Sequence, residues 1–527
     1  MKGRALLAVV AAAAFAAPAN AQTFPTNDAT LRRIWEIGMQ QSQVYPLLQV
    51  LLDSIGPRLT ATPEHRAGND WLVKTYASWG IPAQVVNYGT WKGWRRGISH
   101  VDLVAPRVRS LEGMILAWSP GTPNGRPVQG EVVILPDVAD SAAFVRWLPN
   151  ARGKFVMVNM AQPTCRPDEN WQRWATEESY NAMRARRDTA TRAWNARVQR
   201  TGQALSLGTG TLGRRLEQAG AAGVIQSRWS QGWGVNKIFD SKNIQNTPSI
   251  DLSCEDYGMV FRLAEHNQGP VLRVTAEASF TGEVPVGNAI AEIRGREKPS
   301  EYVVLSSHFD SWDGSQGATD NGTGTVVMLE AMRILRQAYP NPKRTIISGH
   351  WAGEEQGLIG SRAFAADRPE VVSGLQALFN QDNGTGRVVN LSSSGLTRAA
   401  GNYAGWIAQL PEQLTRHFTG IAFPGQPGGG GSDFASFLCY GAPAFSLGSL
   451  GYDYGTYTWH TNRDSFDKIN FDDVRSNAVL TAMLVYLASE DPETVPRDRR
   501  VIINRDGSTG EWPACATPAR RSAEWTR

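Results

Sequence analysis

Residues Val303–Gly360 read VVLSSHFDSWDGSQGATDNGTGTVVMLEAMRILRQAYPNPKRTIISGHWAGEEQGLIG, and this stretch decides the fold. An apolar run ends at His308, a Gly/Asn-rich turn contains Asp320, and an amphipathic helix pattern follows. A second apolar run ends shortly before the adjacent acids Glu354 and Glu355. Strand, loop, helix and strand predict an α/β fold. Because ligands of open α/β sheets bind beyond the carboxyl ends of strands, these polar side chains indicate half of a functional site.

Length and composition limit the classes of protein that this chain can be. Its 527 residues are 42% hydrophobic, which is enough for more than one domain with a buried core. The formal net charge is only +4, and no basic block alternates with aromatic residues. We therefore expect no nucleic-acid partner.

The amino terminus, MKGRALLAVVAAAAFAAPANAQ, combines a basic start, an apolar run and a small-x-small cleavage site. This pattern predicts a secretory signal at residues 1–21, cleaved after Ala21. No later segment is apolar and long enough to predict a membrane span. The mature protein is expected to be periplasmic or secreted.

The chain contains four cysteines, Cys165, Cys254, Cys439 and Cys515. In an oxidising compartment they could form up to two disulfides by three connectivities. Their spacing matches no zinc-thiolate motif. We favour Cys165 with Cys254, because both follow strands of one predicted insert, and buried free thiols stay an open alternative.

The polar residues of the deciding stretch suggest a catalytic metal site. Catalytic zinc takes His, Asp and Glu ligands and leaves room for water, and paired zinc ions clamp the attacking and leaving oxygens. Of only seven histidines, His308 and His460 lie in loops crowded with Asp and Asn. His350, inside an apolar strand, is predicted to be a core residue, and His417, in a polar helix, a surface residue.

Four motifs occur in order, HFDSWDGSQGATDNGTG, GHWAGEEQG, NQDNGTG and WHTNRDSFDKI. Together they resemble the co-catalytic dizinc aminopeptidase family, whose members include bacterial secreted leucyl aminopeptidases and plasma glutamate carboxypeptidase. The motifs span residues 306–469. The N-terminal IGPRLT at residues 55–60 and the helix pattern at residues 69–80 extend the resemblance over nearly the whole mature chain. It implies the zinc-exopeptidase fold, a mixed sheet flanked by helices.

By motif position, the resemblance implies that Asp320 bridges two zinc ions and that Glu354 is the general base for metal-activated water. It also implies a strained or cis peptide bond after Asp320. The other implied ligands form two pairs, one for each ion: His308 with Asp382, and Glu355 with His460.

The local context of the two adjacent acids fits these roles. In a regular strand Glu354 and Glu355 would point to opposite faces, so both can reach one site only beyond the strand's end. Two carboxylates this close repel unless a cation neutralises them. Asp382 carries the least specific signal, because Asp-Asn-Gly is also a common turn.

The other site predictions concern residues around the ligands. Asp310 is placed to accept the second ring N–H of His308, and Asp464 follows His460 at four residues. An aromatic loop is predicted to wall the first side-chain pocket, with packing as the alternative. Its residues are Tyr452, Tyr454, Tyr457 and Trp459. The N-terminal Arg58 and His65 are predicted to be structural or surface residues.

The predicted catalytic domain comprises residues 22–122 and 283–490. Short strands and an Ala/Gly-rich helix at residues 123–282 resemble the protease-associated domain often inserted in secreted zinc exopeptidases. Residues 491–527 form a tail without a recognisable motif.

We therefore expect a dizinc aminopeptidase or dipeptidase that hydrolyses peptides. Two alternatives are a glutaminyl cyclase-like zinc acyltransferase and a non-catalytic binding protein on the same scaffold. Asn321-Gly322 after the bridging acid favours a peptidase, and no metal ligand is missing. Side-chain preference, substrate length, native metal and oligomeric state stay open.

Overall fold

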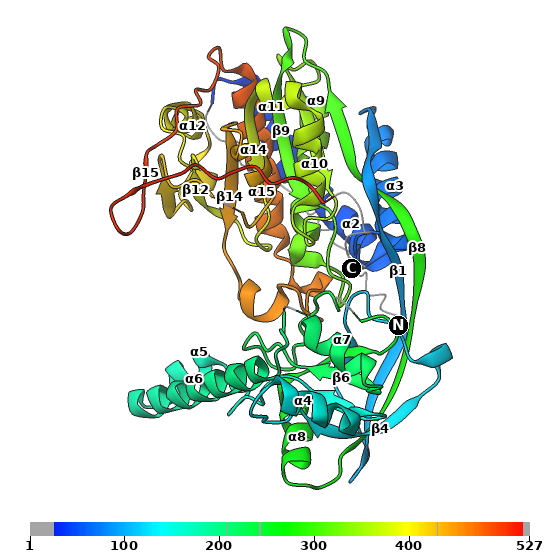
Figure 1. The fold of residues 1–527 in the computed structure, drawn as a ribbon. Coiled ribbons are helices and arrows are strands. Elements are labelled where there is room, and N and C mark those ends of the chain that lie inside the picture. Colours follow the sequence, from blue (N-terminus) through cyan, green and yellow to red (C-terminus); the bar gives the residue numbers. More distant parts are fainter. Residues whose placement is uncertain (1–25, 207, 242–243, 429, 520–527) are drawn as a thin grey trace, which may run out of the picture.

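The computed structural model describes residues 26–519 except residues 207, 242–243 and 429. The signal predicted at residues 1–21 lies outside the described residues. Figure 1 shows an upper part, in which helices surround a sheet, and a smaller lower α/β part. Two long strands join them, β1 (Ala83–Ala105) and β8 (Val271–Ile293), which pair antiparallel.

The upper sheet is mixed and is built around parallel strands. Strand β9 (Lys298–His308) pairs in parallel with β10 (Arg344–Trp351) on one side and with β11 (Leu375–Asn380) on the other. Strand β11 pairs in parallel with β14 (Ala444–Ser449), and β8 lies antiparallel to β10. The predicted mixed α/β sheet is confirmed. Its outer strands are β12 (Val388–Ser392) and β13 (Gly420–Ala422).

Helix α9 (Thr323–Ala338) starts directly after the Asp320 turn and is buried from Thr323 to Leu335. It contacts β9, β10, α15 (Phe471–Glu490) and α1 (Ala29–Gln40). Burial on all sides explains its apolar composition and anchors the turn that precedes it. The other helices of the upper part are α2 (Val44–Gln49), α3 (Pro63–Ser78), α10 (Ile359–Asp367), α11 (Pro369–Ser373), α12 (Ala399–Ile407), α13 (Glu412–Thr415) and α14 (Ala435–Leu438).

The lower part, which we call the insert, continues the upper sheet through β8. Its strands follow β8 in the order β4-β5-β6-β7-β3. The domain bounds at residues 122/123 and 282/283 stay a prediction, because one sheet runs through both parts. The strands are β2 (Arg109–Ser110), β3 (Gly113–Ile115), β4 (Val128–Ile134), β5 (Phe155–Met157), β6 (Gly223–Gln226) and β7 (Ser249–Leu252), and the helices are α4 (Ser141–Trp147), α5 (Asp168–Trp174), α6 (Glu177–Arg200), α7 (Gly210–Gln218) and α8 (Cys254–Glu265).

All four cysteines are paired, Cys165 with Cys254 and Cys439 with Cys515. The favoured pairing is confirmed, and the alternative of free thiols is wrong. The second disulfide ties the tail to the end of α14, and a hairpin of β15 (Ile502–Ile503) and β16 (Thr509–Gly510) lies between its cysteines. Within residues 26–519, apart from the gaps, no helix has both the length and the apolar character that crossing a bilayer needs.

Candidate active site

The predicted site residues meet at the carboxyl end of the parallel strands. Strand β9 ends at His308, and Trp351 at the end of β10 pairs with it directly. Glu354 and Glu355 follow β10, and Asp382 follows β11 on the opposite side of β9. Parallel neighbours end at the same edge of a sheet, so three separate loops deliver these side chains to one place.

Asp320 lies between two imidazoles. Its Oδ1 is 3.3 Å from Nε2 of His308, and its Oδ2 is 3.2 Å from Nε2 of His460. The peptide bond between Asp320 and Asn321 is cis, as the family resemblance implied. One carboxylate thus faces two different histidines that are 152 positions apart in the sequence.

Each histidine also lies beside one further carboxylate. Nε2 of His308 is 3.0 Å from Oδ1 of Asp382, and Nε2 of His460 is 3.0 Å from Oε2 of Glu355. The two pairs are those that the sequence predicted. None of these five side chains, Asp320 included, is more than 10% exposed.

Glu354, the predicted base, lies on the His308 side of this cluster. One ligand atom each of His308, Glu354 and Asp382 lies within 4.8 Å of the others. Burial raises the pKa of Glu354 well above its ordinary value, and repulsion from Asp382 adds to this against the attraction of His308. A carboxyl group with a raised pKa can hold a proton at neutral pH.

Asp310 supports the cluster in a different way from the one predicted. The ring Nδ1 of His308 contacts the main-chain oxygen of Asp310 at 3.0 Å, whereas the nearer carboxylate oxygen is 3.9 Å away. The Asp310 carboxylate instead accepts hydrogen bonds from the backbone N–H groups of Glu354 and Glu355 and from the hydroxyl of Thr60. It thereby fixes the turn that carries both acids.

Asp464 likewise binds the segment of Asp320 rather than the histidine four positions before it. Its carboxylate accepts hydrogen bonds from the N–H of Thr319 at 2.7 Å and from the N–H of Asp320 at 3.0 Å. The Nδ1 atom of His460 has no hydrogen-bond partner in the described part of the chain. The sequence spacing therefore indicated the right neighbourhood but the wrong contact.

Arg58, predicted to be a structural or surface residue, is structural, but its contact with the site loops was not predicted. Its fully buried guanidinium donates hydrogen bonds to the carbonyl oxygens of Gly56, Phe309, Gln316 and Gly317. It therefore holds both ends of the loop that leads from His308 to Asp320. The residue lies in the N-terminal stretch that shares the family resemblance, but no spacing rule links it to a loop some 250 positions later.

The chemistry of this donor set fits metal ions. Two imidazoles and four carboxyl groups gather in a buried space, and Oδ2 of Asp320 and Oε1 of Glu355 are buried without a hydrogen bond. Burial opposes charge on His460, but the carboxylates of Glu355 and Asp320 outweigh it and raise its pKa to about 9. Such a concentration of negative charge requires cations, whether protons or metal ions.

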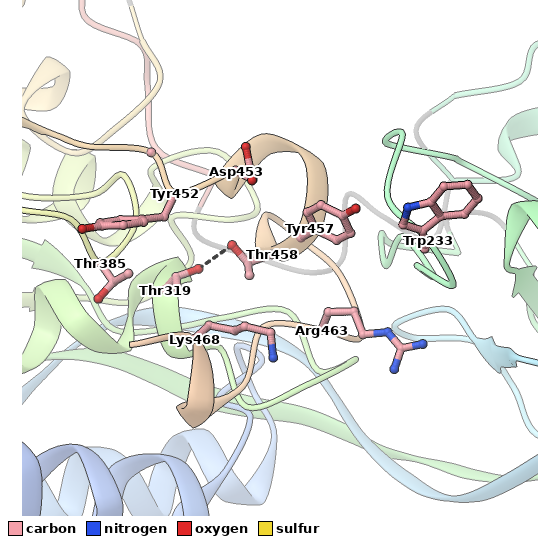
Figure 2. Close-up of a pocket in the computed structure, with 10 residues that line it drawn as sticks. Trp233, Thr319, Thr385, Tyr452, Asp453, Tyr457, Thr458, Arg463 and Lys468 are labelled. Carbon is pink, nitrogen blue, oxygen red and sulfur yellow. Dashed lines mark hydrogen bonds between the residues drawn. The ribbon is translucent and has the colours of Figure 1, made fainter. Parts of the chain in front are cut away.

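The predicted pocket tyrosines do not all lie together. Tyr452 and Tyr457 line a cavity of about 400 Å³ beside Trp233 of the insert. Figure 2 shows this pocket and the hydrogen bond between Thr319 and Thr458, which lie next to the metal-site loops in sequence. Tyr454 does not line this pocket. Burial raises its pKa well above the usual value, and the carboxylates of the cluster add to the effect, which places Tyr454 near them.

The prediction that His350 is a core residue is confirmed: it is fully buried in β10, and Tyr76 contacts its Nε2 at 2.7 Å. His417 was predicted to be a surface residue in a helix, but it lies just after α13 and is half-buried. His65, like Arg58, proves to be buried, where it packs on Phe309.

Comparison with known proteins gives a consistent family. Residues 288–485 match Peptidase family M28. Carboxypeptidase Q of Mus musculus is 25% identical over 466 residues, which cover 87% of this chain and 88% of the relative. A peptidase M28 precursor from Shewanella amazonensis SB2B has a TM-score of 0.64 at 21% identity and covers 89% of this chain and 99% of that chain. BSAP, a zinc aminopeptidase from Bacillus subtilis, has a TM-score of 0.55 at 17% identity, with coverages of 86% and 96%.

The two solved structures share the fold of this chain, and the family match contains every residue of the cluster from His308 to His460. The expected reaction class is thereby confirmed over a binding protein without catalysis. The domain at residues 288–485 matches Peptidase family M28, and together with the similarity to Carboxypeptidase Q this match indicates a peptide-bond hydrolase.

Proposed function

We propose that this chain is a dizinc exopeptidase of the aminopeptidase or dipeptidase type. The observation that carries the proposal is the position of Asp320, whose two oxygens face His308 and His460 separately. Each histidine has its own second carboxylate, as a pair of metal sites with a shared bridge needs. The zinc in the name of the Bacillus subtilis relative agrees with this donor set.

Asp320 would bridge the two ions, His308 and Asp382 would hold one, and His460 and Glu355 would hold the other. When bound, such a metal pair lowers the pKa of water and polarises the scissile carbonyl. Binding releases protons, because imidazoles must be neutral to act as ligands.

Glu354 moves the proton. It accepts a proton from the attacking water, and its raised pKa lets it hold that proton until the leaving amine takes it. Asp310 keeps Glu354 and Glu355 in place through their backbone N–H groups. The two adjacent acids thus have different roles, Glu354 as the general base and Glu355 as a metal ligand.

The substrate's free amino group binds beside the carboxylates, which restricts hydrolysis to the chain end. Its first side chain enters the cavity lined by Tyr457 and Trp233. Tyr457→Ala should change the preference among amino-acid anilides, whereas Tyr440→Ala, at an exposed tyrosine that does not line this pocket, should not. An unchanged preference in Tyr457→Ala would remove the pocket assignment.

We also infer that the mature protein is secreted or periplasmic. Two disulfides require an oxidising compartment in most organisms, and the amino terminus has the pattern of a cleaved signal. Sequencing of the exported protein should give Gln22 as its first residue. Retention of residues 1–21 in the exported protein would contradict the cleavage site.

The decisive test separates chemistry from metal binding. Wild type, Glu354→Gln and a surface control, Glu370→Gln, are assayed on an anilide panel with and without chelator, and their zinc content is measured. We expect Glu354→Gln to lose about 10³-fold or more in kcat while keeping its zinc, and Glu370→Gln to match wild type. Hydrolysis retained in Glu354→Gln, or undiminished in the chelated wild type, would overturn the proposal.

A further inference from the structure

The loop that carries His460 is held by the insert, not only by the catalytic sheet. Residues Lys237 and Thr461 form an antiparallel bridge, and the N–H of Ile238 donates to the carbonyl of His460 at 2.8 Å. Beside it, the N–H of Asn236 donates to the side chain of Asn462 at 2.9 Å. A short segment of the insert, residues 236–239, therefore runs along the His460 loop.

His460 needs this support because its backbone is strained. Its φ is 57°, in the left-handed region, which residues other than glycine rarely adopt and which costs on the order of 1 kcal/mol. The carbonyls on both sides of its Cα atom are bound by the insert. Ile238 binds the carbonyl of His460, and the Nζ of Lys237 donates to the carbonyl of Trp459 at 2.6 Å.

The two histidines of the cluster are oriented by different means. Nδ1 of His308 contacts a main-chain oxygen, which fixes its ring, whereas Nδ1 of His460 has no hydrogen-bond partner in the described residues. Three aromatic rings pack around the His460 ring instead: Trp459 at 4.0 Å, Phe239 at 5.1 Å and Trp312 at 5.8 Å between centroids. The orientation of the His460 ring therefore depends on the hydrogen bonds to its backbone and on the packing of these aromatic rings.

Lys237 is the buried charge at the centre of this arrangement. It is 5% exposed, and its Nζ lies 4.4 Å from the centre of the Trp459 ring as well as on the Trp459 carbonyl. Its own backbone N–H donates to the carboxylate of Asp251, which also accepts from the side chain of Asn236. A lysine is rarely buried without a specific partner, and here the partner is the peptide that precedes a metal ligand.

Resting on the proposed dizinc function, we propose that Lys237 is a positioning residue of the metal site: by holding the Trp459 carbonyl it aims His460, so the insert completes one of the two metal positions. Zinc at the His460 and Glu355 position then depends on the insert, and zinc at the His308 and Asp382 position does not. Residues that orient ligands in this way typically contribute about 10–100-fold to metal affinity.

The test is zinc binding by the metal-free full chain, followed by competition with a chromophoric chelator. Lys237→Met should weaken one of the two zinc ions about 10–100-fold and leave the other unchanged. Lys237→Arg should recover most of the affinity, because a guanidinium can also donate to the carbonyl and stack on Trp459. The matched control is Lys92→Met, since Lys92 also lies over a ring, that of Phe280 at 4.0 Å, but belongs to β1 and is not adjacent in sequence to a candidate ligand.

Asn462→Ala provides a second variant that changes no charge, because it removes the contacts of Asn462 to Asn236. It should weaken the same single zinc ion. The inference would be overturned if both variants bound both zinc ions with wild-type affinity. It would also be overturned if both zinc ions were weakened equally and the metal-free protein melted at a lower temperature, because this would indicate a general loss of stability. A wild type that binds fewer than two zinc ions would instead refute the proposed function, so the two failures are distinguishable.

Discussion

Replacement of Arg58 by Lys or Met tests how the loop from His308 to Asp320 is held. The guanidinium donates four hydrogen bonds of 2.8–2.9 Å to buried carbonyls, and the last of these, that of Gly317, is three residues before Asp320. The ammonium group of lysine has three N–H donors on a single nitrogen atom, so Arg58→Lys leaves at least one of the four carbonyls without a hydrogen bond. Methionine leaves all of them unpaired.

The magnitudes follow from the cost of an unpaired buried polar group, about 1–3 kcal/mol. Arg58→Lys should therefore lose about 2–4 kcal/mol, which lowers Tm by about 3–6 °C for a domain of about 300 residues. Arg58→Met should lose more than about 4 kcal/mol, a large fraction of the about 5–15 kcal/mol that stabilises most domains. Both variants should also bind zinc more weakly, because the Asp320 loop loosens.

The assay is calorimetric melting of the metal-free protein, with zinc titration of each variant that folds. Arg398→Lys is the matched control, because the Arg398 side chain is 72% exposed in a surface ion pair and should change stability by less than about 0.5 kcal/mol. If Arg58→Met melted within about 1 °C of wild type, less than about 1 kcal/mol would be lost, and the anchoring role would be refuted.

Three further predictions concern stability. Burial lowers the pKa of His350 from 6.5 to about 3. Between these two values only the unfolded state takes up this proton, so stability falls as pH falls, by up to about 1.4 kcal/mol per pH unit. His350→Gln should remove about 2 kcal/mol of the stability lost between pH 7 and 5 in melting curves, and an unchanged pH dependence would contradict this. Gly360→Ala should lower the free energy of unfolding by about 1–3 kcal/mol, because a Cβ would lie 2.4 Å from the Ala352 oxygen. Gly405→Ala, in open space on α12, should instead raise it by about 0.5–1 kcal/mol. Equal melting temperatures of the two variants would contradict this expectation. Replacing Cys439 and Cys515 together by Ser opens a cross-link over 76 residues and should cost about 4 kcal/mol in denaturant unfolding, and a loss below about 1 kcal/mol would argue against it.

Much of the site could be predicted because it follows from strand ends. An apolar run fixes where β9 and β10 stop, and parallel pairing then places His308 beside the acids after β10. The pairing of His460 with Glu355 came from motif resemblance, since no local pattern relates residues so distant in sequence. The pairing of Cys165 with Cys254 was favoured because both follow strands of one predicted insert, and it is confirmed.

The supporting contacts could not be predicted, because each joins a side chain to a backbone group. Asp464 was assigned to His460 by its spacing of four residues, yet it binds the N–H of Asp320. Arg58 and Lys237 donate side-chain hydrogen bonds to backbone carbonyls at the site, and because every residue has a carbonyl, no pairing of residue types reveals these contacts. Tyr454 was grouped with its neighbours, but it does not line their pocket, and burial together with the carboxylates of the cluster raises its pKa.

Anomalous diffraction at the zinc edge, from crystals of the full chain soaked in zinc chloride, tests the central claim most directly. We predict two peaks about 3.5–4 Å apart on either side of Asp320, one beside His308 and Asp382 and the other beside His460 and Glu355. A single peak, or zinc bound only elsewhere on the chain, would contradict the dizinc assignment.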